Sequence, residues 1–540
     1  MKRAALSLLA ALALGSLGSR VAADSERINA TTIPHVLRYA TAEDVQGLNP
    51  ELNSQAPVAW LSQMTMAYLF RYDHQNRIVP ELATTIPTLA NGGISRDGLT
   101  ITLHLRPGVK WSDGEPFDAD DVIFSINAMN NSANNVVGRD GFDRVTRLDE
   151  PNKYTVVVHL RETYGEIVPT LFSSSGGTAV LPKHLLGSLP DINKAPYNDL
   201  PVGIGPFRYA AWKRGDAVEL EANPYYWRGR PKLERVIMKI IPDRNTVLTQ
   251  LQTGEIDMWF PFGGVYLSRV QAIPSVYVLR MPAYAYNEIA LNVKNPALAD
   301  RTVRQALRLA TDRKALRDKI GHGVGILQDV AAPTVDPAVP KDIPFVEYDP
   351  GNANALLDRD GWVRGPDGIR AKNGTRLSFD VATSSGTPDV DIQIELIRTW
   401  WKAIGVELNV QHYQAAMMFA PYSDGGILYS GKFDVAFLGW FTPVPIDPFN
   451  LYSCKMFPPA GQNVGHYCDP KVDALLAEMR STYDYDRYKT DLGKVLRQMS
   501  DDVPVIVQTG RENIFGINKD LKNFDPNDVS LFDDMMNVDI

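Results

Sequence analysis

Hydrophobic and polar residues alternate with a period of two at several places along the chain, which is typical of strands with one buried face. In the clearest run, residues 99–106, four apolar residues alternate with Thr, His and Arg. A short apolar strand is expected at 109–111, and the Gly and Pro of 112–116 predict a turn after it. Asp118 then stands at a helix N-cap position, and 122–129 continue at helical spacing. The segment predicts strand, turn, short strand and capped helix.

Further along the chain, helical and strand patterns alternate, which favours an α/β lobe with a largely parallel sheet. The arginines of a helix at 301–310, Arg301, Arg304 and Arg308, are expected mostly on its solvated side, with phosphate or carboxylate binding as the alternative. Other helices are expected at 59–72, 247–252 and 394–404, and strands at 35–40, 154–160, 377–381, 406–410 and 433–440.

The length and charge of the chain narrow the class of protein. At 540 residues it is long enough for two or three domains, since single cores seldom exceed about 250–300 residues. Hydrophobic residues at 44% and charged residues at 22% are ordinary globular values, which sets disordered and fibrous classes aside. A formal net charge of −8 argues against nucleic acid as a partner, because phosphate binding needs a basic surface.

The first 23 residues have the pattern of a signal peptide. Lys2 and Arg3 precede an apolar stretch at 4–17, and Val21-Ala22-Ala23 resembles a small-residue cleavage site. An apolar stretch of about 14 residues is too short to span a bilayer comfortably. No cysteine lies near the cleavage site, so we expect a soluble periplasmic protein without a lipid anchor.

The chain has two cysteines, Cys454 and Cys468. An oxidising compartment and the prolines and glycines between them favour a disulfide that closes a local loop. Metal binding with the nearby His466 is the alternative, but two thiols and one histidine at this spacing match no zinc pattern.

Several motifs resemble the signature segment of the family 5 extracellular solute-binding proteins, the periplasmic receptors of peptide, nickel and related ABC importers. Further matches follow in the family's order in 201–259 and 284–313, so the resemblance covers nearly the whole mature chain. Ordinary structural chemistry explains each residue of the signature, which therefore identifies a fold and marks no site. The motifs are Asp97-Gly98-Leu99-Thr100, Leu103-His104-Leu105-Arg106-Pro107-Gly108-Val109-Lys110-Trp111, Asp113-Gly114-Glu115-Pro116-Phe117 and Ala119-Asp120-Asp121-Val122-Ile123-Phe124-Ser125.

The resemblance implies a two-lobed α/β fold of the periplasmic-binding-protein kind, with an extra domain and a hinge of two chain crossings. Closure of the hinge would bury a solute between the lobes. The expected parts are lobe I at 24–75, 200–285 and 510–540, the extra domain at 76–199, and lobe II at 286–509.

A search for catalytic motifs favours binding over catalysis. No His-Glu-x-x-His, Gly-x-Ser-x-Gly or Cys-x-x-Cys pattern occurs. Residues 426–432 match a phosphate-binding loop up to its lysine, but Phe433 stands where Ser or Thr would hold magnesium. We therefore expect no catalytic residue, cofactor or resident metal.

The strongest candidate for solute contact is the end of the apolar strand 433–440. The family commonly has Gly-Trp here, matched by Gly439-Trp440, and then Asp-Pro, matched by Asp447-Pro448. In its peptide-binding members an aspartate between these landmarks pairs with the α-amino group of the peptide. Here 441–446 contain no acid, and a buried ammonium without a countercharge is costly. Asp447 could take that role, or it could be only a turn residue.

The remaining candidates are mostly aromatic. Trp440 is expected as a platform beside the solute, with a core tryptophan as the alternative. Phe262 could equally belong to a packed turn. Such a site suits planar or sugar-like faces as readily as peptides. The other candidates are Phe441 and, at the expected crossing into lobe II, Tyr284, Tyr286 and Asn287.

The predicted function is that of a monomeric periplasmic receptor that captures a peptide or peptide-like solute and hands it to the inner-membrane permease of an ABC importer. An oligosaccharide, an opine or a metal chelate are alternative solutes. Two other classes stay open: a secreted hydrolase with residues assembled from distant positions, and a ligand sensor that docks on a membrane receptor.

Overall fold

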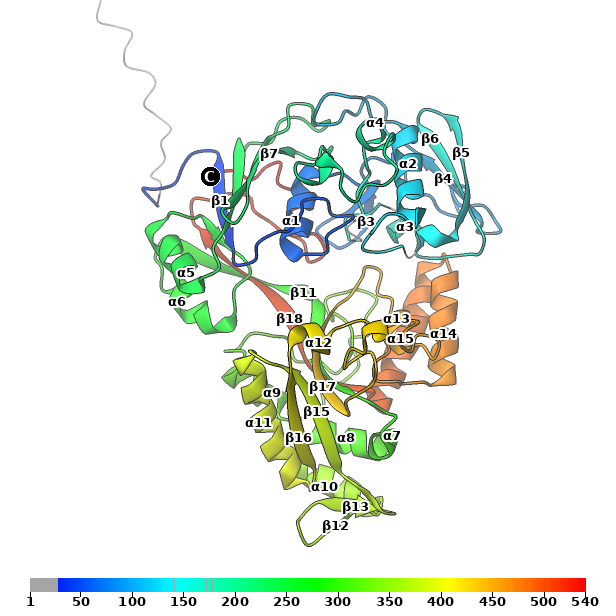
Figure 1. The fold of residues 1–540 in the computed structure, drawn as a ribbon, viewed down its shortest axis with the longest axis vertical. Coiled ribbons are helices and arrows are strands. Elements are labelled where there is room, and N and C mark those ends of the chain that lie inside the picture. Colours follow the sequence, from blue (N-terminus) through cyan, green and yellow to red (C-terminus); the bar gives the residue numbers. More distant parts are fainter. Residues whose placement is uncertain (1–27, 140, 171, 176–177) are drawn as a thin grey trace, which may run out of the picture.

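The computed structural model describes residues 28–139, 141–170, 172–175 and 178–540 (Figure 1). The expected signal peptide, 1–23, lies outside these residues. Within them, no helix has both the length and the apolar character that crossing a membrane requires.

A ten-stranded mixed sheet runs through both halves of the molecule, in the order β16-β15-β17-β11-β18-β10-β1-β9-β8-β7. At its centre β11 (Val276–Leu291) and β18 (Val505–Asn518) pair antiparallel over most of their length. Figure 1 shows these two long strands passing from the upper body to the lower one. They are the two crossings between the lobes.

Lobe I is built around the parallel strands β1 and β9, on which β8 and β7 continue antiparallel. Its core contains Leu37, Tyr39, Val236 and Met238, all with no exposed surface. The elements are β1 (Val36–Thr41), α1 (Ala56–Thr65), β2 (Phe70–Tyr72), β7 (Phe207–Lys213), β8 (Ala217–Ala222), β9 (Arg235–Ile240), α5 (Arg244–Thr253), β10 (Met258–Trp259), η3 (Gly264–Tyr266) and α6 (Leu267–Gln271). The partner of β2, β3 (Ile78–Pro80), already falls in the range of the extra domain.

The extra domain packs α2 against a three-stranded antiparallel sheet, β4-β6-β5. Asp118 caps α2, since its side chain accepts a hydrogen bond from the Asp120 amide, and Asp121 completes a capping box. The strand predicted from the alternation of 99–106 and the helix capped by Asp118 are therefore both present. The elements are β4 (Thr100–His104), α2 (Ala119–Asn130), η1 (Phe142–Arg144), β5 (Val145–Asn152), β6 (Thr155–Leu160), α3 (Ile167–Thr170), α4 (Lys183–Leu186) and η2 (Pro196–Asn198).

Lobe II carries helices on both faces of β15, β16 and β17. One face packs on α8, α10 and α11, and the other on α12 and the loop 427–433. Helices α14 and α15 pack instead on β11 and β18. The elements are α7 (Pro296–Ala299), α8 (Arg301–Leu309), α9 (Arg313–Lys319), α10 (Pro350–Arg359), β12 (Val363–Arg364), β13 (Arg370–Lys372), β14 (Thr375–Arg376), β15 (Ser378–Ser384), α11 (Pro388–Ala403), β16 (Glu407–Tyr413), α12 (Ala415–Met418), η4 (Tyr422–Asp424), β17 (Val435–Phe441), α13 (Phe449–Tyr452), α14 (Pro470–Ser481) and α15 (Tyr485–Asp502).

Three local expectations were wrong. The expected strand at 109–111 is only an isolated bridge between Lys110 and Pro116, because the turn leaves no room for a longer ladder. The helix expected at 59–72 ends at Thr65, since β2 pairs with β3 instead. The sheet of lobe II is parallel only between β15 and its neighbours β16 and β17, because the returning strand β11 pairs antiparallel with β17.

The arginines of α8 are another correction. Arg304 is 6% exposed, and its guanidinium donates to the carbonyls of Asp502 and Leu298, at 2.9 and 2.8 Å. It satisfies backbone carbonyls at the end of α15, which have no partner inside that helix. The solvated face expected from the sequence is thus a packed helix–helix contact at this position. The boundaries between lobe I, the extra domain and lobe II stay a prediction.

Candidate functional site

The carboxyl ends of β15, β16 and β17 lie at the same end of lobe II. The parallel register pairs Val381 with Val435 and Ser384 with Tyr413, so all three strands end on the side where β11 enters lobe II. In α/β sheets, ligands bind outside the carboxyl ends of parallel strands. This edge of lobe II is therefore the candidate site.

A buried acid, Glu288, lies beneath Trp440 at this edge. The register of β11 and β17 pairs Tyr286 with Trp440 and Glu288 with Leu438, which places these side chains on one face of the sheet. The indole Nε1 of Trp440 donates to Glu288 Oε1 at 2.8 Å, and the Tyr452 hydroxyl donates to Oε2 at 3.2 Å. Trp440 is therefore held by a polar contact while its ring stays only partly buried.

Burial governs the charge of Glu288, which is 3% exposed. Loss of hydration raises the pKa of its carboxyl to about 7, and the hydrogen bonds from Trp440 and Tyr452 oppose that rise. In the described part of the chain no Lys, Arg or His forms an ion pair with it. Near neutral pH, the ionisation of Glu288 therefore depends on whether a positively charged group lies beside it.

A cavity borders Glu288, Trp440 and Tyr452 on one side and residues 462–465 on the other. The second wall belongs to a loop closed by the disulfide between Cys454 and Cys468, whose Cα atoms lie 4.8 Å apart. Asn463 ties this loop internally, donating to the carbonyls of Ser453 and Tyr467 at 3.0 and 2.8 Å. The disulfide loop thus supports one wall of the cavity.

Replacing Cys454 and Cys468 with serine is expected to lower the free energy of unfolding by about 3 kcal/mol, the loop-closure entropy of a loop of about 15 residues. Urea unfolding followed by tryptophan fluorescence measures it. The oxidised wild type and the same protein under reductant are the controls, and reductant should reproduce the double substitution. An unchanged unfolding midpoint would contradict the expectation.

Phe441 follows Trp440 and points to the opposite face of the sheet. Its side chain is 75% exposed, and the guanidinium of Arg511, on β18, lies 5.1 Å from the centre of its ring. Desolvation lowers the pKa of Arg511. An exposed aromatic ring thus lies next to an arginine at the crossing of the lobes, and the role of Phe441 in solute contact stays a prediction.

The candidates on β11 are packed. Tyr284 is 7% exposed and donates its hydroxyl to Asp336 Oδ2 at 3.1 Å. Tyr286 is 1% exposed, with its hydroxyl 3.1 Å from that of Tyr452. Asn287 pairs with Gly439, where a Cβ would meet its Oδ1 at 3.0 Å. Both tyrosine side chains are therefore buried within the protein, where they support the candidate site.

Asp447 and Phe262 also have partners inside the protein. Arg480 Nε lies 3.1 Å from Asp447 Oδ2, and Asp447 Oδ1 accepts a hydrogen bond from the Phe449 amide at 2.9 Å. Asp447 is therefore already neutralised by an arginine. Phe262 is 6% exposed and packs on Trp259 in the core of lobe I, with ring centres 5.0 Å apart.

Contacts join lobe II to the rest of the molecule on the side away from the crossing strands. The Val444 carbonyl accepts from the hydroxyls of Tyr72 and Ser175, each at 3.1 Å. The Tyr483 hydroxyl donates to the Gly98 carbonyl at 2.8 Å. Figure 1 accordingly places α14 and α15 below the extra domain, and we call this contact between lobe II and the extra domain the closed arrangement.

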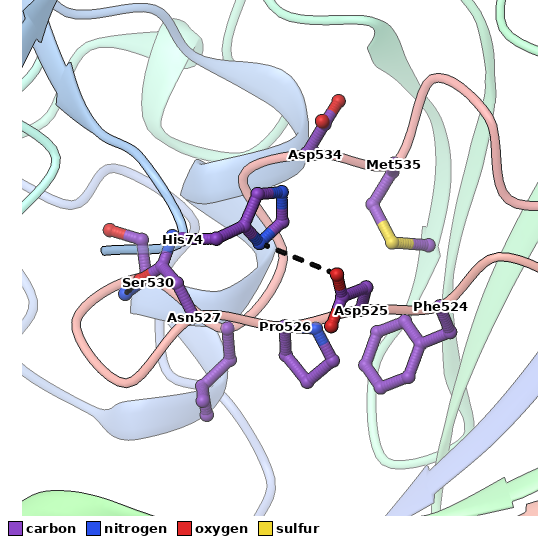
Figure 2. Close-up of a pocket in the computed structure, with 9 residues that line it drawn as sticks. His74, Phe524, Asp525, Pro526, Asn527, Ser530, Asp534 and Met535 are labelled. Carbon is purple, nitrogen blue, oxygen red and sulfur yellow. Dashed lines mark hydrogen bonds and ion pairs between the residues drawn. The ribbon is translucent and has the colours of Figure 1, made fainter. Parts of the chain in front are cut away.

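A second hollow lies away from this edge, where His74 meets the C-terminal segment 524–535 (Figure 2). The imidazole Nδ1 is 3.7 Å from Asp525 Oδ2, and both side chains are largely exposed. Such an exposed pair contributes little. Among the described residues no group of three or more His, Cys, Asp or Glu could hold a metal ion.

Sequence reasoning missed Glu288. A usable signal was present, because an acid interrupts the apolar run Ile289-Ala290-Leu291 at its start, and a charge in a buried strand needs an explanation.

A family model matches residues 77–458, and its description is bacterial extracellular solute-binding proteins, family 5 Middle. This chain belongs to that family. The resemblance of its motifs is thereby confirmed. Among the family's curated members, the oligopeptide-binding protein AppA of Bacillus subtilis is 27% identical over 452 residues, covering 82% of this chain and 80% of AppA. A probable di/tripeptide-binding protein of Pseudomonas aeruginosa is 26% identical over 426 residues, covering 73% of this chain and 76% of that protein.

Solved structures of family members share the fold. AppA of Bacillus subtilis in complex with a nonapeptide superposes with a TM-score of 0.74 at 24% identity, covering 93% of this chain and 98% of that chain. NikZ from Campylobacter jejuni in complex with Ni(L-His) gives 0.74 at 27% identity, covering 92% and 96%. The two-lobed α/β fold expected from the sequence is confirmed.

Proposed function

We propose that this family 5 protein is the periplasmic receptor of an ABC importer and that its solute is a peptide or peptide-like molecule. The observation that carries the proposal is the position of Trp440. It ends a parallel strand beside the two crossing strands, with its ring partly buried and its indole nitrogen held by Glu288. A flat, preorganised aromatic surface at a closing edge loses little entropy when it binds a solute.

The names of relatives support a peptide as the solute. Those of Bacillus subtilis and Pseudomonas aeruginosa are named for oligopeptides and di- or tripeptides. The chelate in NikZ supports a second solute class, a metal held by its own small ligand, for which the receptor needs no metal-binding cluster. Delivery to an inner-membrane permease and a soluble form without a lipid anchor belong to the same proposal.

A melting-temperature screen of residues 24–540 tests the proposal against di- and tripeptides, longer peptides, oligosaccharides and metal–histidine chelates. A solute at 100 times its dissociation constant adds about 2.7 kcal/mol, which raises the melting temperature by a few degrees. Trp440→Ala is expected to abolish that rise. Trp212→Ala, on β7 of lobe I, is the matched control and should keep it.

A response to peptides that Trp440→Ala removes supports the peptide assignment. A response to chelates or sugars alone would show that the solute belongs to another class, and the proposed receptor role would still hold. Turnover of any compound would instead favour the hydrolase alternative.

A further inference from the structure

The cavity beside Glu288 has one polar group with unused capacity. Each oxygen of a carboxylate can accept two hydrogen bonds, and each oxygen of Glu288 accepts one. The amides of the opposite wall are already engaged. Asn463 bonds within its own loop, and Gln462 Oε1 accepts from Asn450 at 3.0 Å. A group that enters the cavity therefore meets a carboxylate as its principal polar partner.

Glu288 has no cationic partner among the described residues, which it shares with the buried Glu51 but not with Asp257 or Asp329. Asp257 is paired with Arg38 at 2.8 Å, and Asp329 with Arg313 at 2.6 Å. Within the described part of the chain, the donors to Glu288 are the neutral side chains of Trp440 and Tyr452. A buried carboxylate held by neutral donors is costly unless it is protonated or a cation joins it.

The aromatic side chains that line the cavity suit a cation. Trp440 and Tyr452 line the cavity with aromatic rings, whose faces attract ammonium and guanidinium groups. The cavity has a volume of about 20 Å³, which is room for one water-sized group, so it admits only the tip of a larger solute.

We propose that Glu288, Trp440 and Tyr452 form the subsite that takes a cationic group of the solute, an ammonium. This inference rests on the proposed receptor function and narrows its solute to molecules with such a group. Glu288 supplies from β11 the negative charge that residues 441–446 lack. Asp447 does not supply it, because Arg480 already neutralises that carboxylate.

The binding test compares the tripeptide Ala-Lys-Ala with the neutral peptide N-acetyl-Ala-norleucine-Ala by calorimetric titration of residues 24–540. The wild type is expected to bind the cationic peptide about 10- to 150-fold more tightly, the range for a hydrogen bond to a charged group. Glu288→Gln keeps the shape of the side chain and should lose this preference. Glu395→Gln, which removes a largely exposed charge on α11, is the matched control and should keep it.

The pH profile separates a binding carboxylate from a structural one. A cation requires the ionised carboxylate, and the pKa of Glu288 in the free protein is about 7. Affinity for Ala-Lys-Ala should therefore fall as the pH is lowered from 7.5 to 5.5, by up to about tenfold per pH unit. Glu288→Gln should remove this dependence.

Other titratable groups around the cavity do not produce the same profile. The phenols of Tyr286 and Tyr452 face Glu288, and Tyr467 lines the same cavity. Burial raises the pKa values of all three above the ordinary value for tyrosine. Asp502, behind Tyr467, accepts the hydrogen bond of that phenol at 2.8 Å. His466 lies in the disulfide loop, where burial lowers its pKa, and its contribution persists in Glu288→Gln.

Each outcome decides between the two proposals. Equal binding of both peptides by the wild type and by Glu288→Gln overturns the cationic subsite and leaves the peptide receptor in place. If neither peptide binds, the peptide assignment fails, and spermidine then serves as the cation. Spermidine binding that Glu288→Gln removes supports the subsite, and its absence or persistence overturns it. Should Glu288→Gln fail to fold, Tyr452→Phe, which removes the donor to Oε2, must reduce the preference for the cationic peptide several-fold.

Discussion

Replacing Gly165 with alanine is expected to lower solute affinity by about 5- to 150-fold. A Cβ added at Gly165 would lie 1.8 Å from the carbonyl oxygen of Thr482, at the end of α14, where no real contact is that short. The Gly165 amide also donates to the Arg480 carbonyl across the same contact, at 2.7 Å. Overpacking costs about 1–3 kcal/mol, and here the cost falls on the closed arrangement, which a captured solute requires.

Gly138→Ala is the matched control, because it lies in the extra domain and a Cβ there meets nothing within 4 Å. Both variants should unfold at the same urea concentration without solute. Calorimetric titration with the best solute from the melting screen measures affinity, and small-angle scattering measures the radius of gyration. Unchanged affinity in Gly165→Ala would show that capture does not need this contact.

Arg313→Met is expected to lower the free energy of unfolding by about 3–5 kcal/mol, because it leaves the buried charge of Asp329 to the more distant Arg308, whose Nη1 lies 3.9 Å from Oδ1. The Arg313 side chain has no exposed surface and holds both oxygens of Asp329, at 2.6 and 3.0 Å. The same guanidinium donates to the Val507 carbonyl of β18 at 3.2 Å, so it joins α9 to a crossing strand. Urea unfolding with fluorescence detection measures the loss.

Arg317→Met provides the control on the same helix. Its guanidinium is 29% exposed and pairs only with the neighbouring Asp318, so a change within about 0.5 kcal/mol is expected. Combining Arg313→Met with Asp329→Leu should recover most of the lost stability, since apolar residues can replace a buried ion pair. A loss below 1 kcal/mol in the single variant would show that Asp329 finds another partner or protonates.

Elements with strong local signals could be predicted from the sequence. The alternation of 99–106 and the cap at Asp118 both depend on neighbours within a few residues, and both are present. Asn373-Gly374 likewise forms a tight turn typical of this dipeptide, in which both residues adopt positive φ angles of 51° and 82°. The end of α1 was misjudged because the pairing of β2 with β3 overrides the helical spacing of 66–72.

The candidate site was predicted only in part. Trp440 and Phe441 lie at the end of β17, where the apolar run and the following glycine placed them. Tyr284 and Tyr286 were correctly placed on a crossing strand, but their side chains are buried, which the spacing of aromatic residues does not reveal.

The sequence by itself determined the family, the compartment expected for the mature chain and most of the helices and strands, because motifs and hydrophobic periodicity are local properties. The tertiary structure alone decided which charges meet. Glu288 and Trp440 are 152 positions apart, and Asp447 becomes unavailable only because Arg480 folds against it. Such pairs depend on strand register and on the packing of α14, and neither is encoded in the spacing of residues along the chain.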